Sequence, residues 1–140
     1  MRLVAFVSIL CFLLGCAGSN NTLFESGKIN GSWIPIQQEF AGTSLPASAF
    51  EKQKLIITDS AYTLIAESVD KGIVKYDNNK MDIYGKEGVN AGKHFTAIYK
   101  YENEQLTICY NLKGDSYPVT FDTKGKPMFF LSVFRKESVK

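Results

Sequence analysis

The stretch HFTAIYKYENEQLTICYNL, residues 94–112, indicates two antiparallel β-strands joined by a tight turn. Apolar side chains occupy every second position of each half: Phe95, Ala97, Tyr99 and Tyr101 in the first, and Leu106, Ile108, Tyr110 and Leu112 in the second. Ile98 is the one mismatch in the first half. Because alternate side chains of a strand point to opposite faces, the pattern predicts strands over 94–102 and 105–112, with Asn103 in the turn.

The rest of the chain repeats this organisation of strands and turns. Further strands are predicted at residues 31–40, 54–59, 62–67, 72–76, 80–84 and 128–135. The dipeptides Asp59-Ser60 and Asp70-Lys71 and the stretch 77–79 separate neighbouring strands with residues that favour turns. The sequence therefore predicts an all-β fold of eight strands in simple succession.

One helical signal interrupts the strands. Ser48 and Glu51 have the spacing of a capping box, which predicts a single short helix after the first strand. Because no other helical period is present, a parallel sheet built from βαβ units is not expected. Sequential antiparallel strands remove their exposed edges by closing, so we predict an eight-stranded antiparallel up-and-down barrel; a two-sheet sandwich is the alternative.

The N-terminal segment has the layout of a secretion signal. Arg2 is followed by an apolar run and then by small residues before Cys16. The run is shorter than the ~20 apolar residues that cross a bilayer. Leu13-Leu14-Gly15-Cys16 resembles the lipobox of bacterial lipoproteins, which implies cleavage before Cys16 and lipidation, palmitate included, of Cys16. The alternative is an ordinary cleavable signal with a passive cysteine at that position.

The lipobox resemblance divides the chain into three parts. Residues 1–15 are the expected signal peptide, 16–29 a flexible tether rich in Gly, Ser and Asn, and 30–140 the barrel domain. It also implies a protein of the bacterial cell envelope, attached to the membrane through the lipid on Cys16. Ala17 after the cysteine favours the outer membrane, by resemblance to the sorting rule of enteric bacteria.

The charge of the chain and its cysteine content limit the expected partners and the possible disulfide bonds. The formal net charge of +2 falls by one when Arg2 leaves with the signal, and the basic residues are scattered. A nucleic-acid partner is therefore not expected. Of the three cysteines, Cys11 leaves with the signal and Cys16 is committed to lipid, so Cys109 has no disulfide partner.

An ordered set of segments gives the chain a family resemblance. NGSWIPI, an LP pair before the short helix, KLIITDSAYTL, HFTAIYKYENEQLTICYN and a final VFRK resemble the bacterial lipocalin-like (calycin-type) domain, over residues 30–136. In lipocalins the Gly-x-Trp tryptophan closes one end of the barrel beneath a basic side chain of the last strand. The resemblance assigns these two structural roles to Trp33 and Arg135. The alternative for Trp33 is an ordinary core aromatic.

Patterns that carry catalysis or bind metal are missing from the sequence. His94 is the only histidine, whereas zinc sites usually draw on several His or Cys ligands, so we expect a solvated histidine at a strand edge. Cys109 falls on the polar face of its strand, which indicates a passive thiol. The glycines of 85–92 and Lys93 lack P-loop spacing and indicate a flexible loop at the barrel mouth. We predict no catalytic residues, no metal, no cofactor and no enzymatic activity.

The more apolar face of the strands is expected to point inward. This gives a predicted lining of Tyr62, Leu64, Phe95, Ala97, Tyr99, Leu106, Ile108 and Tyr110. The first hypothesis is that these residues hold a small hydrophobic ligand. Core packing explains the same face, so the second hypothesis is a filled barrel that serves as an interaction or structural module of the envelope, contacting a protein through loops 85–93 and 113–127.

The last predicted strand is apolar on both faces. Its sequence, MFFLSVF, places large apolar side chains at successive positions. The outer face therefore needs a cover, and the candidates are the tether and the loop at 113–127.

Overall fold

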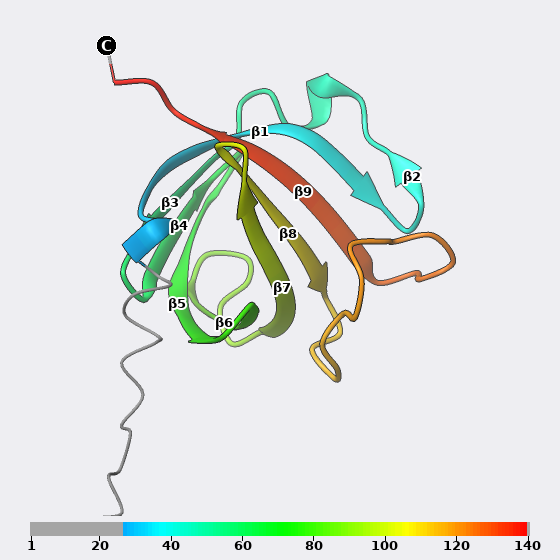
Figure 1. The fold of residues 1–140 in the computed structure, drawn as a ribbon. Helices are drawn as coiled ribbons and strands as arrows, with labels where there is room; N and C mark the ends of the chain where they lie inside the picture. The colour runs from blue at the N-terminus through cyan, green and yellow to red at the C-terminus, as the bar shows by residue number, and fades with distance from the viewer. Residues whose placement is uncertain (1–26, 140) are drawn as a thin grey trace, which may run out of the picture.

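The computed structural model describes residues 27–139, which form a closed antiparallel β-barrel. The expected signal peptide and Cys16 lie outside the described residues. Strands follow one another around the barrel in chain order, and the last pairs with the first (Figure 1). The elements are β1 (Gly31–Phe40), β2 (Thr43–Ser44), the 3-10 turn η1 (Ala47–Ala49), β3 (Lys54–Thr58), β4 (Ala61–Ile65), β5 (Val69–Asp77), β6 (Lys80–Glu87), β7 (His94–Glu102), β8 (Gln105–Asn111) and β9 (Phe129–Lys136). The predicted eight-stranded up-and-down barrel, with the architecture of lipocalins, is confirmed.

The pairing between β1 and β9 closes the barrel. Trp33 pairs with Lys136 at one end of this ladder and Phe40 with Phe130 at the other, with a bulge between Pro35 and Gln37. Strand β2 only extends the end of β1 by a two-residue pairing. Closure leaves no long unpaired edge on the barrel, which removes the usual site of edge-to-edge aggregation.

The predicted capping box is wrong. The helical turn η1 covers only Ala47–Ala49, its N-cap is Pro46, and it has no side-chain cap. Ser48 lies inside the turn instead of before it, so its hydroxyl is not placed to receive the first free backbone N–H groups. The short helix after the first strand is therefore a single 3-10 turn held by backbone hydrogen bonds.

The end of the barrel that contains Trp33 is filled by side chains, and we call it the closed end. The Trp33 indole Nε1 donates a 2.8 Å hydrogen bond to the carbonyl oxygen of Ile29, and Tyr101 packs edge-on against its ring. Both Ile29 and Trp33 are fully buried. Ile29, placed by sequence in the tether, therefore belongs to the core.

The basic residue over Trp33 is Lys136, so the assignment of Arg135 needs correction. Lys136 Nζ lies 5.6 Å from the centre of the Trp33 ring, and the two residues are direct partners in the ladder. Arg135 pairs instead with Ile34 and is exposed. The role implied by the lipocalin resemblance is thus carried by the neighbouring residue, because a shift of one position moves a strand side chain to the other face.

A second apolar cluster lies on the outside of β7, β8 and β9. Ile98, Cys109 and Leu131 are buried there, with Phe121 and Phe129 packed against them. Phe121 belongs to the loop 112–128, which confirms that this loop covers the outer face of the last strand. Cys109 is fully buried in this cluster and not on a polar face, and burial raises the pKa of its thiol to about 11.

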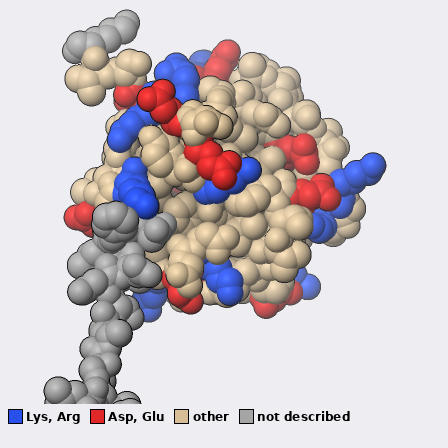
Figure 2. Space-filling model, viewed as in Figure 1, with Lys and Arg blue, Asp and Glu red and all other residues tan. Residues whose placement is uncertain are grey.

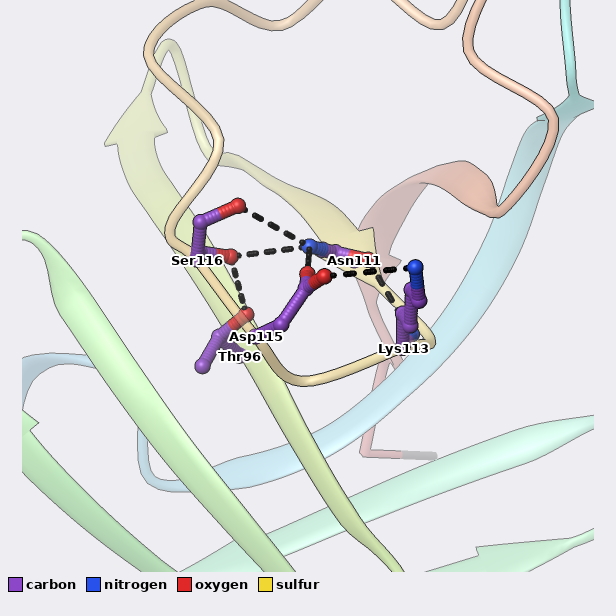
Figure 3. A network of polar contacts seen from close by, with 5 residues as sticks. All are labelled: Thr96, Asn111, Lys113, Asp115 and Ser116. Atoms are coloured by element: carbon purple, nitrogen blue, oxygen red, sulfur yellow. Dashed lines mark hydrogen bonds and ion pairs between the residues drawn. The ribbon is translucent and has the colours of Figure 1, made fainter.

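Polar contacts fasten the start of this loop to the barrel (Figure 3). The Asn111 side-chain amide donates to Asp115 Oδ1 at 2.9 Å and to the Ser116 carbonyl at 3.0 Å. The Thr96 hydroxyl donates to the same carbonyl at 2.5 Å, and the backbone N–H of Lys113 donates to Asn111 Oδ1 at 3.0 Å. Because Thr96 and Asn111 are buried on neighbouring strands, they hold the loop against the outer cluster.

Candidate functional site: a cavity at the open end

The interior opposite the closed end holds a cavity of about 620 Å³. Its lining is Gln38, Gln53, Leu55, Ile57, Tyr62, Leu64, Val74, Tyr76, Met81, Ile83, Asn90, Lys93, Phe95, Ile108, Tyr110, Leu112, Met128, Phe130 and Phe134. The exposed Lys93 and Met128 mark the mouth, at the loops 88–93 and 112–128. Cavities of about 300–1,000 Å³ hold small organic ligands, so the space has the size of a binding site.

Strand β5 shapes one wall of the cavity by strict alternation. Gly72, Val74 and Tyr76 are buried, and the residues between them are exposed. A Cβ atom at Gly72 would lie 2.6 Å from Tyr62 Cε1 and 2.1 Å from the carbonyl oxygen of Tyr84. Because glycine has no side chain, the Tyr62 ring lies directly against β5 and the cavity keeps its width.

Tyr76 lies at the floor of the cavity, where the cavity meets the closed end. Its ring packs edge-on against Tyr99, with 5.9 Å between ring centres. Tyr99 belongs to the closed end, where its hydroxyl donates to the carbonyl oxygen of Asn78 at 3.2 Å. Of the two rings, only that of Tyr76 lines the cavity.

A short polar network borders the cavity near β1. The Gln38 side-chain amide donates to Gln53 Oε1 at 2.8 Å, and the Gln53 amide donates to the carbonyl oxygen of Ala49 at 3.1 Å. Gln38 also donates to the Ser132 hydroxyl at 3.3 Å. These glutamines are neutral and their amides already have acceptors, so this side of the cavity adds polarity without adding charge.

The loop 88–93 at the mouth is fixed by a buried carboxylate. Asp70 is 4% exposed, and its Oδ1 accepts a 3.0 Å hydrogen bond from the backbone N–H of Asn90. Gly88 has a φ of +89°, and a Cβ there would lie 2.4 Å from Asp70 Oδ1. Lys93 extends from this loop toward solvent, with Nζ 3.5 Å from Asn90 Oδ1.

Three tyrosines, Tyr62, Tyr76 and Tyr110, line this mostly apolar space. Burial raises the pKa of Tyr76 to about 12 and is also the main cause of the raised pKa values of Tyr62 and Tyr110. The charge of Asp70 raises the pKa of Tyr62 further. All three hydroxyls therefore keep their protons at physiological pH.

The predicted lining residues divide between the cavity and the rest of the core. Tyr62, Leu64, Phe95, Ile108 and Tyr110 line the cavity, whereas Ala97, Tyr99 and Leu106 are buried in the core without lining it. The sequence prediction missed Val74, Tyr76, Met81 and Ile83, although their alternation along β5 and β6 carried the signal.

The cluster around His94 lies outside the cavity. Its Nε2 is 2.7 Å from Asp82 Oδ1, its ring stacks on Tyr84, and the hydroxyl of Tyr117 donates to Asp82 Oδ2. Sequence reasoning found the histidine but not these partners, because Tyr117 comes from the loop 112–128. His94 is half-buried and partnered, so it differs from the solvated residue that was predicted.

On the face shown in Figure 2, acidic and basic side chains are interspersed. Residues 27–139 contain no group of three or more His, Cys, Asp or Glu placed to hold a metal ion. Within the same range, no helix has the length and apolar character needed to cross a membrane.

Comparisons with models of protein families, with curated proteins and with solved structures give no significant match to this chain. The assignment of a site therefore rests on the geometry of the barrel and its cavity.

Proposed function

We propose that this protein is a lipid-anchored, lipocalin-like lipoprotein of the bacterial envelope that binds a small hydrophobic ligand in its barrel. The observation that supports binding is the cavity of about 620 Å³ at the open end. Its wall is mostly apolar, with a few polar groups at defined places, which is the usual composition of small-molecule sites. The alternative for this fold is a barrel filled by its own side chains. The open end differs from this alternative because it holds the cavity.

The proposed anchor is consistent with the way the chain enters the barrel. Ile29 is buried against Trp33 at the closed end, on the opposite side of the barrel from the mouth. A lipid attached to Cys16 would thus be connected to the end that has no opening. The ligand route and the attachment point would not compete for the same part of the surface.

Binding is tested by identifying what the protein retains when it is isolated from cells. The full chain is purified from membranes in nanodiscs and examined by native mass spectrometry, beside empty nanodiscs from the same lipid extract. We expect a discrete bound species, lost when Ile83→Trp fills the cavity. A protein that carries no species beyond the lipids of empty nanodiscs would contradict the proposed binding function.

The anchor is tested separately. Replacement Cys16→Ala should abolish metabolic labelling with palmitate, because the proposed acceptor sulfur is gone. Cys109→Ala is the matched control, since that thiol is buried in the barrel. Persistent labelling of Cys16→Ala would refute the anchor without bearing on the cavity.

A further inference from the structure

Three tyrosines that line the cavity have hydroxyls without a partner among residues 27–139, and we call Tyr62, Tyr76 and Tyr110 the tyrosine trio. The three residues come from β4, β5 and β8 and all line the cavity. Within residues 27–139, none of their hydroxyls makes a hydrogen bond. The Tyr76 side chain is only 8% exposed, and solvent does not reach its hydroxyl oxygen.

Other tyrosines of the barrel show the usual arrangement. The Tyr99 hydroxyl has the carbonyl oxygen of Asn78, and the Tyr117 hydroxyl has the carboxylate of Asp82. A buried hydroxyl without a partner is unfavourable, and most buried polar groups in proteins are paired. The hydroxyl of Tyr76 is closed off from the cavity by its neighbours. Tyr62 and Tyr110 are half-buried in the cavity wall, where Tyr110 packs against Phe130, and their unpaired hydroxyls indicate where a ligand would supply a partner.

The trio favours an acceptor on the ligand. Because burial raises the pKa of each phenol, all three keep their protons over the physiological range and are able to donate. A phenol O–H pairs well with a carbonyl oxygen. A ligand that lacked any oxygen would displace water from the hydroxyls of Tyr62 and Tyr110 without replacing its hydrogen bonds.

The distribution of charge favours a neutral acceptor. Lys93 is the only charged residue among those lining the cavity within the described chain, and it lies exposed at the mouth. The buried Asp70 places a negative charge near Tyr62. An anionic group next to the trio would lose its hydration, gain no cation and be repelled by Asp70.

We propose that the cavity takes a neutral, largely apolar carbonyl compound whose oxygen accepts hydrogen bonds from the tyrosine trio, chiefly from Tyr110. This inference rests on the proposed binding function and specifies the chemical class of its ligand. The apolar walls around the trio hold the hydrocarbon body.

The test compares two probes that differ only in the group double-bonded to one carbon atom. Methyl nonyl ketone is matched with the alkene in which a methylene group replaces its carbonyl oxygen, and both are equilibrated by dialysis with the full chain in nanodiscs. Protein-free nanodiscs measure partition into lipid. The variants are Tyr110→Phe and Tyr62→Phe, and the control is Tyr84→Phe, whose ring lies outside the barrel against His94.

We expect Tyr110→Phe to lower the ratio of ketone to alkene affinity about fivefold, the effect of one net hydrogen bond, with a smaller decrease in Tyr62→Phe. Tyr84→Phe should leave the ratio unchanged. The infrared carbonyl stretch of the bound ketone should lie at lower frequency in the wild type than in Tyr110→Phe.

Three results would overturn the inference. If both probes bind and the ratio is the same in every variant, the carbonyl is not recognised, although the proposed binding function stands. If the carboxylate of the same chain length binds more tightly than the ketone and Lys93→Gln removes that advantage, the ligand class is anionic. If neither probe binds beyond protein-free nanodiscs, the binding function and this inference both fail.

Discussion

At the closed end of the barrel, Trp33 and Tyr99 are buried and each has a hydrogen-bond acceptor for its polar group. At the open end, the tyrosine trio surrounds a cavity of about 620 Å³ and has no acceptors among residues 27–139. Both ends are built from the same alternating strands. The comparison indicates that the closed end stabilises the barrel, while the open end retains space and, at Tyr76, an unpaired buried hydroxyl that costs stability.

The largest expected effect on the free energy of unfolding comes from removing a large side chain from the closed end. Trp33→Ala should lower the free energy of unfolding by about 3–5 kcal/mol, because a fully buried indole and its hydrogen bond are lost. Phe95→Ala, at the half-buried cavity wall, should cost about half as much. Urea denaturation of both variants measures the difference, and equal losses would contradict the division between the two ends.

Gly72→Ala should lower the free energy of unfolding by about 3 kcal/mol, since its methyl group would meet the Tyr84 carbonyl and the Tyr62 ring. Thermal denaturation with ligand titration would show whether displacement of Tyr62 also narrows the cavity. Gly27→Ala is the control, because an added Cβ there meets nothing within 4 Å. If Gly72→Ala were as stable as Gly27→Ala, β5 would be able to shift and accommodate the added methyl group, contrary to the expected clash.

Alkaline pH should weaken the folded state through Tyr76. Its pKa is raised from 10.0 to about 12 in the folded protein, so its contribution is full below pH 10.0 and is lost as pH rises to about 12. The expected loss is about 2 kcal/mol, after allowance for partial screening. Denaturation curves of wild type and Tyr76→Phe at increasing pH should diverge in this window; parallel curves would contradict the assignment.

The smallest expected effect is a change in the free energy of unfolding that has opposite signs at the two ends of the barrel. At neutral pH and without ligand, Tyr76→Phe should raise the free energy of unfolding by about 1 kcal/mol, because it removes an unpaired buried hydroxyl. Tyr99→Phe should lower it by about 1 kcal/mol, because it removes a hydrogen bond to Asn78. Calorimetric melting distinguishes the two, and destabilisation by both would mean that Tyr76 has a partner.

The strands were predictable from sequence because alternation is a local property. The predicted segments 31–40 and 94–102 coincide with β1 and β7, and the other strands differ at their ends by a few residues. Register was not predictable, since it depends on which residues pair across the barrel. The basic residue over Trp33 is Lys136 and not Arg135, because the register differs by one position from the predicted one.

Alternation identified the inward face but not the depth of each side chain along the barrel. Tyr99 and Leu106 share the inward face with Phe95 and Ile108, yet the first two lie in the closed end and the last two line the cavity. Cys109 was misplaced for another reason. Its burial depends on the distant loop 112–128, whose position is a tertiary property that local pattern does not show.

The sealed position of Cys109 gives the barrel a built-in reporter of motion. It is the free cysteine of the described chain, and its sulfur is covered by the loop that Asn111 and Thr96 hold in place. A thiol reagent reaches it only when this loop leaves the outer face of β8. The labelling rate at low reagent concentration and constant pH therefore measures the equilibrium population of molecules in which the thiol is uncovered.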